Sequence, residues 1–562
     1  MRIRNLRLLK LKQILILSLL ILVIGCSSLN YTSITNIKND SPMSINRDVP
    51  NLSDYIAWEN NGTLVCNAKY DQFSPELICN SDGSVIITWH DNREGIQPDI
   101  YSQKVASNGK NIWIPNGTMI NNKTGEQYEP QICSDGDGGA IIVWTDTEGD
   151  YNITAQRIAS NGTVMWKKNG ISVCNFTGNQ EEPQICSDGN KGAIIAWQDW
   201  RDGNLDIYAQ RLNSNGVKLW GLNDTVICNA TGAQWNVKLC YNGVGEAIIT
   251  WQDGRTGEDD IYAQMIDLDG NILWTKNGTA ICNATNDQSD PQICCDGSGG
   301  AIITWTDKRG ANWDIYAQRI NSDESSLWTT NGSVICNATD IQEAPQICSD
   351  GSGGAIITWE DARDYSISDK DVYAQKIISG GYVVWVTNGV IVCNEFEDQY
   401  SIQICEDGLG GAIITWEDYR DSSTKGIDIY AQRITSRGTR NWIANGSIIC
   451  NELDDQEDPR ICYDGQRRVT ITWYDHRGTN NDIYAQRIIL TPPSIYSGDD
   501  DDDDEEKEED NTVLIAFIGF ALIVGIAIGI YIFYRYKPEQ FKSIGRKARA
   551  LGEKAKEKMK KE

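Results

Sequence analysis

One phrase of this sequence recurs eight times, and repetition at a fixed period is the signature of a fold built from copies of one structural unit. The stretch GGAIITW occurs letter for letter at residues 299–305, 353–359 and 410–416, and DIYAQRI follows it at 314–320 and 428–434. The copies align on the tryptophan of a W-x-D-x-R motif and lie 53 to 57 residues apart, at Trp89, Trp144, Trp197, Trp251, Trp305, Trp359, Trp416 and Trp473.

Each unit contains four strand-like pieces. A short PQICSDG piece is followed by GAIITW, a continuous apolar run typical of a strand buried on both faces, and then by the alternating DIYAQRI. The fourth piece, such as GNILW at 270–274, follows a polar turn. Four strands in about 54 residues, with glycine-rich turns and no helical periodicity, are typical of one blade of a β-propeller.

A second motif indicates how such a ring closes. W-x-x-N-G, written W-x-x-N-D at 220–224, also occurs eight times, half a unit away from the first motif, at Trp58, Trp113, Trp166, Trp220, Trp274, Trp328, Trp385 and Trp442. The repeat region, residues 58–490, therefore begins with the last part of a blade and ends with the first part of one. A closed ring leaves no strand edge unpaired. We predict an all-β fold, a single eight-bladed β-propeller of four-stranded blades with end-to-end closure; an open stack of units is the alternative.

The N-terminal residues 1–28 are typical of an export signal. Basic residues precede a short apolar run, 14–24, that is too short to cross a bilayer, and small residues follow it. The sequence around Cys26 resembles the lipobox of bacterial-type lipoproteins, which would make Cys26 a lipidated residue. An uncleaved N-terminal anchor is the alternative reading. Residues 29–57 form a linker to the first blade.

The C-terminal part of the sequence predicts a membrane anchor. Residues 512–534 include 22 consecutive uncharged residues, enough to span about 30 Å of hydrocarbon as a helix. An acidic stalk, 491–511, precedes this segment, and a basic tail with 11 Lys/Arg and 4 Glu, 535–562, follows it. Because positive charge stays on the cytoplasmic side, we predict a single-pass protein of the cell membrane with its N-terminal domain outside and its tail in the cytoplasm.

Charge also limits the partners. The formal net charge is −28, which excludes nucleic acid as a partner of the propeller. In the tail, Phe541, Ile544, Ala548, Leu551 and Met559 recur at helical spacing among lysines, a pattern that suits contact with anionic lipid. A solvated tail that only determines topology is the alternative.

Cysteines recur in pairs about a dozen residues apart, each pair bracketing the crossing from one blade into the next. Disulfides belong to oxidising compartments, so we predict seven bonds within these pairs, with Cys133 and Cys295 left over. Zinc is the alternative, although the spacing differs from that of structural zinc sites. The predicted pairs are Cys66 with Cys79, Cys174 with Cys186, Cys228 with Cys240, Cys282 with Cys294, Cys336 with Cys348, Cys393 with Cys405, and Cys450 with Cys462.

Sequons for N-glycosylation recur at two fixed places in the unit, C-N-A-T and W-x-x-N-G-[ST]. In a protein outside the cell these asparagines are candidate glycan acceptors. They include Asn61, Asn116, Asn229, Asn277, Asn283, Asn331, Asn337 and Asn445.

The constancy of W-x-D-x-R and DIYAQR indicates architecture, because an active site occurs once, where copies differ. Asp307, Arg309 and Asp314 are suited to hold a strand-to-strand turn by charge-assisted bonds. Units of this kind resemble the repeats of secreted β-propeller proteins from bacteria and archaea, which are distantly similar to sialidase-type propellers. The resemblance covers residues 58–488 and implies the fold but no activity. The Asp-box of sialidases is not matched, since the aspartate of 349–353 directly follows the serine.

Enzyme motifs are absent from the sequence. It has no G-x-S-x-G, H-E-x-x-H or phosphate-binding glycine loop, and only two histidines, His90 and His476. We therefore expect no cofactor or bound metal, and an enzyme is the less favoured interpretation. A glycosidase-like pair of carboxylates is the alternative, because Asp and Glu are plentiful.

A binding function is better motivated. The loop between GAIITW and DIYAQ varies from unit to unit while its flanks stay constant, as expected of a rigid scaffold that presents contacts. Aromatic residues on these loops, Trp200, Trp313, Tyr365 and Tyr419, together with Trp235 at a blade crossing, are the predicted ligand-binding residues. Packing between loops is the alternative role. We expect an extracellular binding, adhesion or coat protein for a glycan or protein ligand, with a surface carbohydrate-active enzyme as the alternative.

Overall fold

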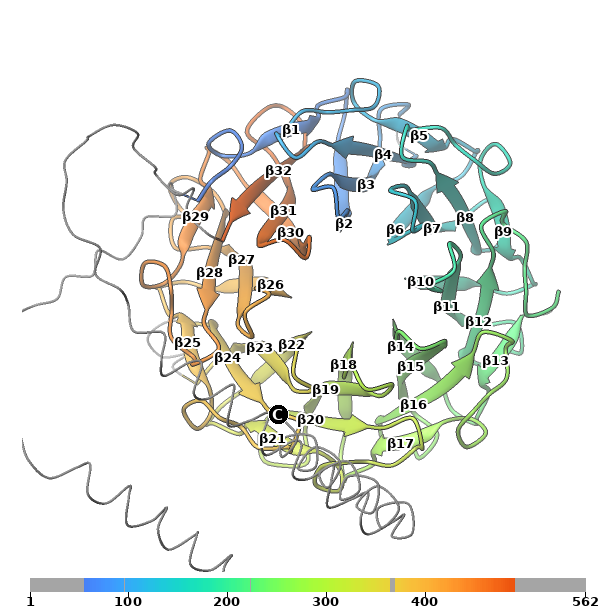
Figure 1. The fold of residues 1–562 in the computed structure, drawn as a ribbon, viewed down its shortest axis with the longest axis vertical. Coiled ribbons are helices and arrows are strands. Elements are labelled where there is room, and N and C mark those ends of the chain that lie inside the picture. The colour runs from blue at the N-terminus through green and yellow to red at the C-terminus, as the bar shows by residue number, and fades with distance from the viewer. Residues whose placement is uncertain (1–54, 96, 223, 364–368, 491–562) are drawn as a thin grey trace, which may run out of the picture. The chain divides into compact units, whose positions relative to one another are not determined.

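Strand formation follows the apolar pattern of the repeat. The computed structural model describes residues 55–490 apart from 96, 223 and 364–368, and every regular element in this part of the chain is a β-strand. Eight antiparallel sheets of four strands each stand around a ring (Figure 1). The prediction of an all-β, eight-bladed propeller of four-stranded blades is confirmed.

The first strand of each blade lies at the inside of the ring. Each has eight residues and is longer than the strand predicted from the PQICSDG piece, because it begins at a glutamine further upstream. The side chain of this glutamine bonds to the crossing before the strand: Gln288 Nε2 donates to the Asn286 carbonyl at 2.7 Å. The pairing with the second strand shifts after Ser289, and Asp290 has a φ of 54°, so each inner strand contains a bulge near its start. These strands are β2 (Gln72–Cys79), β6 (Gln127–Ser134), β10 (Gln180–Ser187), β14 (Gln234–Tyr241), β18 (Gln288–Cys295), β22 (Gln342–Ser349), β26 (Gln399–Glu406) and β30 (Gln456–Tyr463).

The second strand is the apolar phrase, buried on both faces as predicted. Its tryptophan, Trp305 in the fifth blade, has no solvent exposure, and the same holds for the equivalent tryptophan of every blade. Aromatic side chains of this size bury roughly 150–250 Å² each, so these residues dominate the contacts between blades. The strands are β3 (Val85–Asp91), β7 (Ala140–Asp146), β11 (Ala193–Asp199), β15 (Glu246–Asp253), β19 (Ala301–Asp307), β23 (Ala355–Asp361), β27 (Ala412–Asp418) and β31 (Arg468–Asp475).

The third strand, DIYAQRI, is buried along almost its whole length, although its sequence alternates. Its polar side chains are inside because they bond to the backbone: Gln318 Nε2 donates to the Thr329 carbonyl at 2.8 Å, and its Oε1 accepts from the Trp328 N–H at 3.0 Å. The strands are β4 (Asp99–Val105), β8 (Asn152–Ile158), β12 (Asp206–Leu212), β16 (Asp260–Asp267), β20 (Asp314–Ile320), β24 (Asp371–Ile377), β28 (Asp428–Ile434) and β32 (Asp482–Ile489).

The predicted fourth strand is wrong in position. GNILW makes only an isolated bridge, Ile266 with Ile272, because the Trp274 side chain leaves the sheet and donates from Nε1 to the Ser322 carbonyl of the next blade at 3.0 Å. The outermost strand follows the N-G turn instead. There Gly332 has a φ of +93°, and a Cβ would lie 2.6 Å from the Trp305 ring. These strands are β1 (Thr63–Cys66), β5 (Thr118–Asn121), β9 (Ile171–Cys174), β13 (Thr225–Cys228), β17 (Thr279–Cys282), β21 (Ser333–Cys336), β25 (Val390–Cys393) and β29 (Ser447–Cys450).

The ring closes by sharing one sheet between its ends, as predicted. Strand β1 pairs antiparallel with β32, Thr63 opposite Ala485, so the eighth blade has the order β1-β32-β31-β30. The residues before β1 extend this pairing, since the Ala57 N–H donates to the Arg487 carbonyl at 2.9 Å. No strand edge between the chain ends is left open, and the first and last strands lie side by side in Figure 1.

The predicted cysteine pairing is wrong. Cys79 is bonded to Cys462, not to Cys66, and the remaining cysteines of residues 55–490 are free thiols in the structure. The second cysteine of each predicted pair lies near the far end of an eight-residue inner strand, roughly 20 Å from the strand's start. The first cysteine lies before that start, beyond the reach of a disulfide. The unbonded members are Cys66, Cys174, Cys186, Cys228, Cys240, Cys282, Cys294, Cys336, Cys348, Cys393, Cys405 and Cys450.

The predicted export signal with its Cys26 lipobox, the acidic stalk, the transmembrane segment and the basic tail lie outside the described residues, as does almost all of the predicted linker. Within residues 55–490, the structure contains no helix that is long and apolar enough to span a membrane.

Candidate functional site

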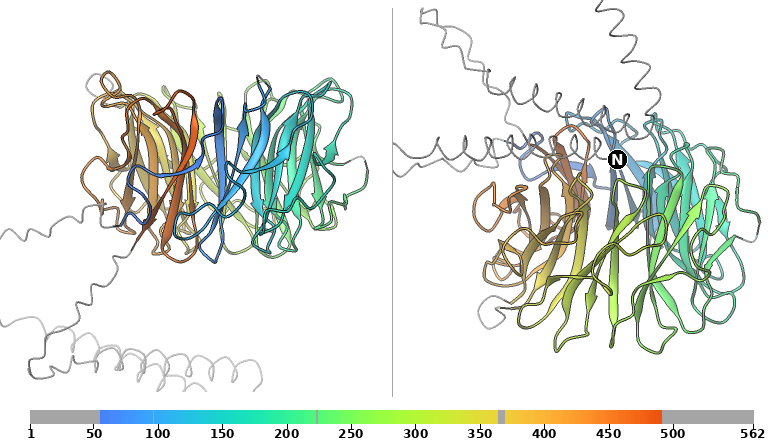
Figure 2. Two further views of the ribbon diagram at one scale, coloured as in Figure 1. Left: turned by 90° about the horizontal axis from the view of Figure 1, so that it is seen from above. Right: turned by 60° about the horizontal axis from the view of Figure 1, so that its bottom comes forward.

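Each blade presents loops at two ends of the ring. We call one end the crossover rim; it is formed by the loops between second and third strands, such as 308–313, and by the crossings between blades, such as 283–287. The other end, the turn rim, is formed by the hairpins between first and second strands, such as 296–300, and the loops between third and fourth strands. Figure 2 shows the strands running between these two ends.

The W-x-D-x-R motif forms a polar clamp at the crossover rim. In the fifth blade the buried carboxylate of Asp307 accepts hydrogen bonds from Trp305 Nε1 at 2.8 Å and from Arg309 Nε at 2.8 Å. The Arg309 guanidinium lies 3.9 Å from the centroid of the Tyr316 ring, a cation–π contact. Three constant side chains of the motif and one of the DIYAQR phrase therefore satisfy one another.

The same arginine also joins neighbouring blades. Arg309 Nη2 donates to the Asn331 carbonyl at 2.7 Å and contacts Cys282 Sγ at 3.1 Å. Cys282 ends the outermost strand of the preceding blade, and burial raises the pKa of its thiol to about 12. The recurring cysteine thus belongs to the clamp, which explains its constancy without a disulfide.

The clamp recurs in seven blades, which supports the structural interpretation of the motif. Its arginine–aspartate pairs are Arg93 with Asp91, Arg201 with Asp199, Arg255 with Asp253, Arg309 with Asp307, Arg363 with Asp361, Arg420 with Asp418, and Arg477 with Asp475. The second blade departs, as the sequence indicated. Glu148 stands where the arginine would be, Lys123 approaches Asp146 at 3.3 Å instead, and Trp144 Nε1 has no hydrogen-bond partner within the described residues.

Four of the five predicted ligand-binding residues lie at the crossover rim, on consecutive or nearby blades. Trp200 is 42% exposed and donates from Nε1 to Glu181 at 3.2 Å. Trp235 is half-buried near the start of β14, and Trp313 is half-buried, with Lys308 Nζ 5.1 Å from its ring centroid. Tyr419 is also half-buried. Tyr365 lies outside the described residues.

The structure adds aromatic residues that the loop comparison did not identify. Tyr400 of β26 meets Tyr419 edge-on, with ring centroids 5.6 Å apart. Phe73 of β2 lies 5.5 Å from Tyr474 of the eighth blade and 5.4 Å from His90. In the second blade Tyr128 contacts Tyr151 at 6.0 Å. We define the aromatic rim as Phe73, Tyr128, Tyr151, Trp200, Trp235, Trp313, Tyr400, Tyr419 and Tyr474.

The sequence signal that would have identified the rim residues within strands is a pair of positions that face each other across two strands. Tyr400 is the second residue of an inner strand and pairs with Glu417, the first variable position of W-x-D-x-R. The same two positions pair in every blade, for example Phe73 with His90. Comparing both positions between units, as well as the loop, would have identified these residues.

Carboxylates accompany the aromatic rings. Burial raises the pKa of Glu417 to about 6, and it raises the pKa of Glu457, which Asp455 raises further. Glu417 Oε1 accepts the bulge N–H of Asp458 in the next blade at 2.7 Å.

Elsewhere a neutral amide fills the same role as Glu417. Gln198 accepts the Asn236 N–H at 3.3 Å, and Gln252 accepts the Asp290 N–H at 3.4 Å. The blade junction needs an acceptor at this position but no charge. A carboxylate occurs there in the sixth blade as Glu360, which pairs with Lys370 at 3.0 Å, and in the seventh blade as Glu417.

The two histidines lie in neighbouring blades, as closure predicted. Burial lowers the pKa of His90 to about 4, so it is neutral at physiological pH, whereas His476 is exposed. Within residues 55–490, apart from the gaps given above, His, Cys, Asp and Glu form no group that could hold a metal ion.

The predicted glycan acceptors fall into two structural classes. Asn229, Asn283 and Asn337 of the C-N-A-T motif are exposed. Asn61, Asn116, Asn277, Asn331 and Asn445 are half-buried in turns with positive φ. Asn445 Nδ2 donates to Glu395 at 2.8 Å, a bond that a glycan would displace. The exposed asparagines of the C-N-A-T motif are therefore more accessible for glycosylation than the half-buried ones.

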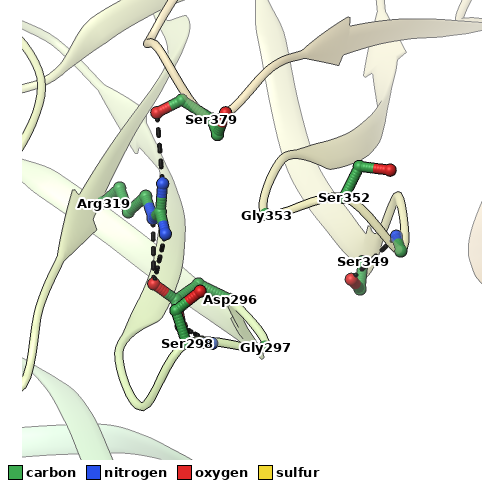
Figure 3. Close-up of a pocket in the computed structure, with 9 residues that line it drawn as sticks. Asp296, Gly297, Ser298, Arg319, Ser349, Ser352, Gly353 and Ser379 are labelled. Atoms are coloured by element: carbon green, nitrogen blue, oxygen red, sulfur yellow. Dashed lines mark hydrogen bonds and ion pairs between the residues drawn. The ribbon is translucent and has the colours of Figure 1, made fainter. Parts of the chain in front are cut away.

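A pocket of about 420 Å³ lies on the turn rim between the fifth and sixth blades (Figure 3). Its charged side chains already bind each other: Arg319 Nε donates to Asp296 at 2.9 Å, and Arg319 Nη1 donates to the Ser379 carbonyl at 3.2 Å. Serine and glycine residues form most of the remaining wall. The crossover rim, with partly exposed aromatic rings and raised carboxyl pKa values, is the stronger candidate site.

No model of a known family matches this sequence, and a comparison with curated proteins gave no match. Solved structures with a similar fold include an ulvan lyase of a polysaccharide lyase family bound to -[GlcA(1-4)Rha3S]-, with 12% identity and a TM-score of 0.42 over 69% of this chain and 96% of that chain. They also include an α-L-arabinanase from Penicillium chrysogenum with arabinobiose, at 12% identity and a TM-score of 0.35, covering 65% and 93%.

A third is the β-propeller domain of the Trilobed protease from Pyrococcus furiosus, at 12% identity and a TM-score of 0.36, covering 66% of this chain and 99% of that chain. At these scores the likeness concerns the propeller architecture alone, and the functional argument rests on the residues of this chain.

Proposed function

We propose that this protein is a membrane-anchored surface protein whose propeller binds a glycan or protein ligand at the crossover rim. The observation that carries the proposal is the aromatic rim, a row of partly exposed rings at positions where the blades differ. The constant residues around these positions are already engaged in the clamp, so the variable residues are the ones available to a ligand.

The charge of the crossover rim limits the classes of ligand that suit it. Glu417, Glu457 and Asp458 lie among the rings, and the chain as a whole carries −28. A surface of this sign repels polyanions. Aromatic faces stack on the apolar faces of sugars and accept cations. A neutral glycan or a basic protein segment therefore suits the site better than a uronate-rich or sulfated polysaccharide.

Binding by single-residue variants of the full chain tests this proposal. Purified wild-type protein in detergent would be screened on neutral, anionic and cationic glycans and on cell surfaces. Replacement of Trp200 or Tyr419 by Ala should weaken binding by about tenfold or more, since a single aromatic anchor contributes on the order of 1–2 kcal/mol. Tyr382→Ala is the matched control, because Tyr382 is 72% exposed but lies on the turn rim.

Three results would count against the proposal. Equal loss of binding in Tyr382→Ala would place the contact on the turn rim. Unchanged binding in both crossover-rim variants would make these rings packing groups. Preference for polyanions would contradict the charge argument.

A surface carbohydrate-active enzyme is the second candidate, and Glu417 is the observation that favours it. A carboxyl group with a pKa of about 6 is suited to general acid catalysis, and Glu457 would supply the second carboxylate. Glu417→Gln tests this role cleanly, because Gln198 and Gln252 show that glutamine maintains the blade junction. Turnover of a glycan by the wild-type chain that this variant abolishes, with binding retained, would establish the enzyme.

The anchoring of the protein is part of the proposal. An export signal at residues 1–28, a transmembrane helix at 512–534 and a cytoplasmic basic tail at 535–562 would place the propeller outside the cell. The basic tail would contact anionic lipid of the inner leaflet. Protease treatment of intact cells should remove the propeller and spare the tail; cleavage of the tail instead would reverse the topology.

A further inference from the structure

The inner strands carry a circle of cysteines near their turn-rim ends. Two adjacent positions are involved. The earlier position holds Cys133, Cys186, Cys240, Cys294, Cys348, Cys405 and Cys462, whereas a cysteine at the later position occurs only twice, as Cys79 and Cys295. Register establishes the equivalence of these two: Cys79 pairs with Val85 and Cys295 pairs with Ala301, each the residue four before the clamp tryptophan of its blade.

The two positions face opposite neighbours, because successive residues of a strand point to opposite faces. Cys294, at the earlier position, packs with Ala355 and Ile357 of the following blade. Cys295 pairs with Ala301, which packs in one cluster with Cys240 of the preceding blade. A cysteine at the later position therefore faces a cysteine at the earlier position of the blade before it.

The disulfide in the structure has this geometry. Cys462 occupies the earlier position of the eighth blade, Cys79 occupies the later position of the first blade, and they are bonded across the junction where the ring closes. The junction between the fourth and fifth blades reproduces this arrangement with Cys240 and Cys295.

We propose that Cys240 and Cys295 form a second disulfide between blades. The Cys295 thiol already lies against the end of β14, donating to the Tyr241 carbonyl at 2.9 Å, next to Cys240. A hydrogen bond with the Cys295 thiol, together with burial, raises the pKa of Cys240 well above its ordinary value. At the other six junctions the later position holds Ser134, Ser187, Tyr241, Ser349, Glu406 or Tyr463, so no cysteine occupies the position that faces the earlier residue.

The bond would complete a symmetric pair of cross-links. The junction of the fourth and fifth blades lies across the ring from the junction of the eighth and first, as the positions of β14, β18, β30 and β2 in Figure 1 show. Each half-ring of four blades would then be bonded to the other half at both ends. A disulfide that closes a loop raises stability mainly by constraining the unfolded chain.

Formation of this bond is an oxidation. Each thiol loses one proton and one electron, and a disulfide oxidant accepts the two electrons and two protons to become two thiols. Oxidised glutathione serves as this oxidant in a test. The raised pKa of Cys240 disfavours the thiolate, so mildly alkaline pH is required for a practical rate.

Peptide mapping of the full chain tests the proposal. Protein purified in detergent is incubated with oxidised glutathione, blocked with N-ethylmaleimide and digested with trypsin without reduction. Cleavage after Lys238, Arg255, Lys276 and Lys308 gives peptide 239–255, which contains Cys240, and peptide 277–308, which contains Cys295. We expect these two peptides to be linked, alongside the Cys79–Cys462 pair.

Two adjacent variants distinguish Cys295 from the other cysteines of its peptide. Cys295→Ser should abolish the link and leave Cys240 alkylated, whereas Cys294→Ser should retain it. The proposal is overturned if the link survives in Cys295→Ser, or if Cys240 is alkylated in oxidised wild-type protein that contains the Cys79–Cys462 bond. A stoichiometric zinc content in the wild-type chain that Cys295→Ser removes would also overturn it.

Discussion

The five positions of W-x-D-x-R in each blade hold two sets of residues. One set is constant and structural, and the other varies between blades and is available to a ligand. In W-x-D-x-R the tryptophan and aspartate are constant in all eight blades and the arginine in seven, and together they form the clamp. The two positions between them vary: Thr306 and Lys308 in the fifth blade correspond to Glu417 and Tyr419 in the seventh. Within the strand, which ends at the aspartate, alternation separates the first variable residue from the tryptophan and aspartate on either side of it, because neighbouring residues point to opposite faces. A repeat can therefore keep its architecture constant while it changes its surface one residue away.

The comparison also explains why repetition does not obscure function in this chain. Constant polar residues look catalytic when one unit is considered alone, and Asp307 with Arg309 is an example. Their hydrogen bonds to Trp305 and Asn331 account for them. The residues that differ between the blades are the ones that can give the protein its specific function.

The largest effect should come from breaking one clamp. Asp307→Ala would leave the Arg309 guanidinium and Trp305 Nε1 without their buried acceptor, so we expect unfolding to become easier by about 3–5 kcal/mol. Urea unfolding of the full chain, monitored by tryptophan fluorescence, measures the change. Asp146→Ala in the second blade is the control, because no arginine faces it, and its loss should be clearly smaller. Equal losses would show that the arginine contributes nothing specific.

The second effect concerns the variable position next to the clamp and depends on pH. Burial raises the pKa of Glu417 to about 6, above its ordinary value of 4.5. Its contribution to stability is therefore fully present below about pH 4.5 and is lost as the pH rises through 6. A shift of this size corresponds to roughly 2 kcal/mol.

Glu417→Gln should remove this dependence. Relative to wild type, the variant should gain up to about 2 kcal/mol of unfolding free energy between pH 4.5 and pH 7. Paired urea titrations at the two pH values measure the difference. A difference between the two proteins that does not change with pH would show that Glu417 titrates as an ordinary exposed carboxyl group.

The fold was predictable because its signals are periodic. Two motifs half a unit apart determine the number of blades and the closure. The position of the outermost strand was not predictable from GNILW, because the apolar Trp274 packs on the next blade and the true strand, Thr279–Cys282, has only four residues. The cysteine pairing failed for a related reason. Sequence proximity suggested a bond, but the inner strand between the two residues separates them along the ring axis.

The candidate site was predictable only in part. Variable loops identified Trp200 and Tyr419 by their contrast with constant flanks. Tyr400 and Phe73 were missed because they lie within strands, where an aromatic residue is ordinarily core. The bulge at the start of each inner strand is a tertiary feature, and it brings these residues to the rim beside the loop residues.

A third, smaller effect should come from completing the clamp that the second blade lacks. Glu148→Arg combined with Thr154→Tyr would supply the guanidinium and the ring on which it stacks. Asp146 and Trp144 are already in place. We expect a gain of about 1 kcal/mol in unfolding free energy, the size of a well-formed cation–π contact with charge-assisted bonds. Thermal unfolding of the double variant and of Glu148→Ala measures it; a gain in Glu148→Ala of the same size would assign the effect to removal of a negative charge.

The smallest effect on stability should come from the aromatic rim. This prediction compares the constant clamp residues with the variable rim residues most directly, because tryptophan occurs in both. Trp197 belongs to the clamp and is fully buried, whereas Trp200, three residues later, is 42% exposed. Trp200→Ala removes one hydrogen bond to Glu181 from a partly solvated surface, so unfolding should change by no more than about 0.5 kcal/mol while ligand binding falls. Trp197→Phe keeps most of the buried volume but loses the Nε1 bond to Asp199, and it should destabilise the protein without changing affinity. Calorimetry of unfolding and of binding on the same preparations checks both expectations. A loss of stability in Trp200→Ala that matches that of Trp197→Phe would mean that the variable residues also hold the blades together.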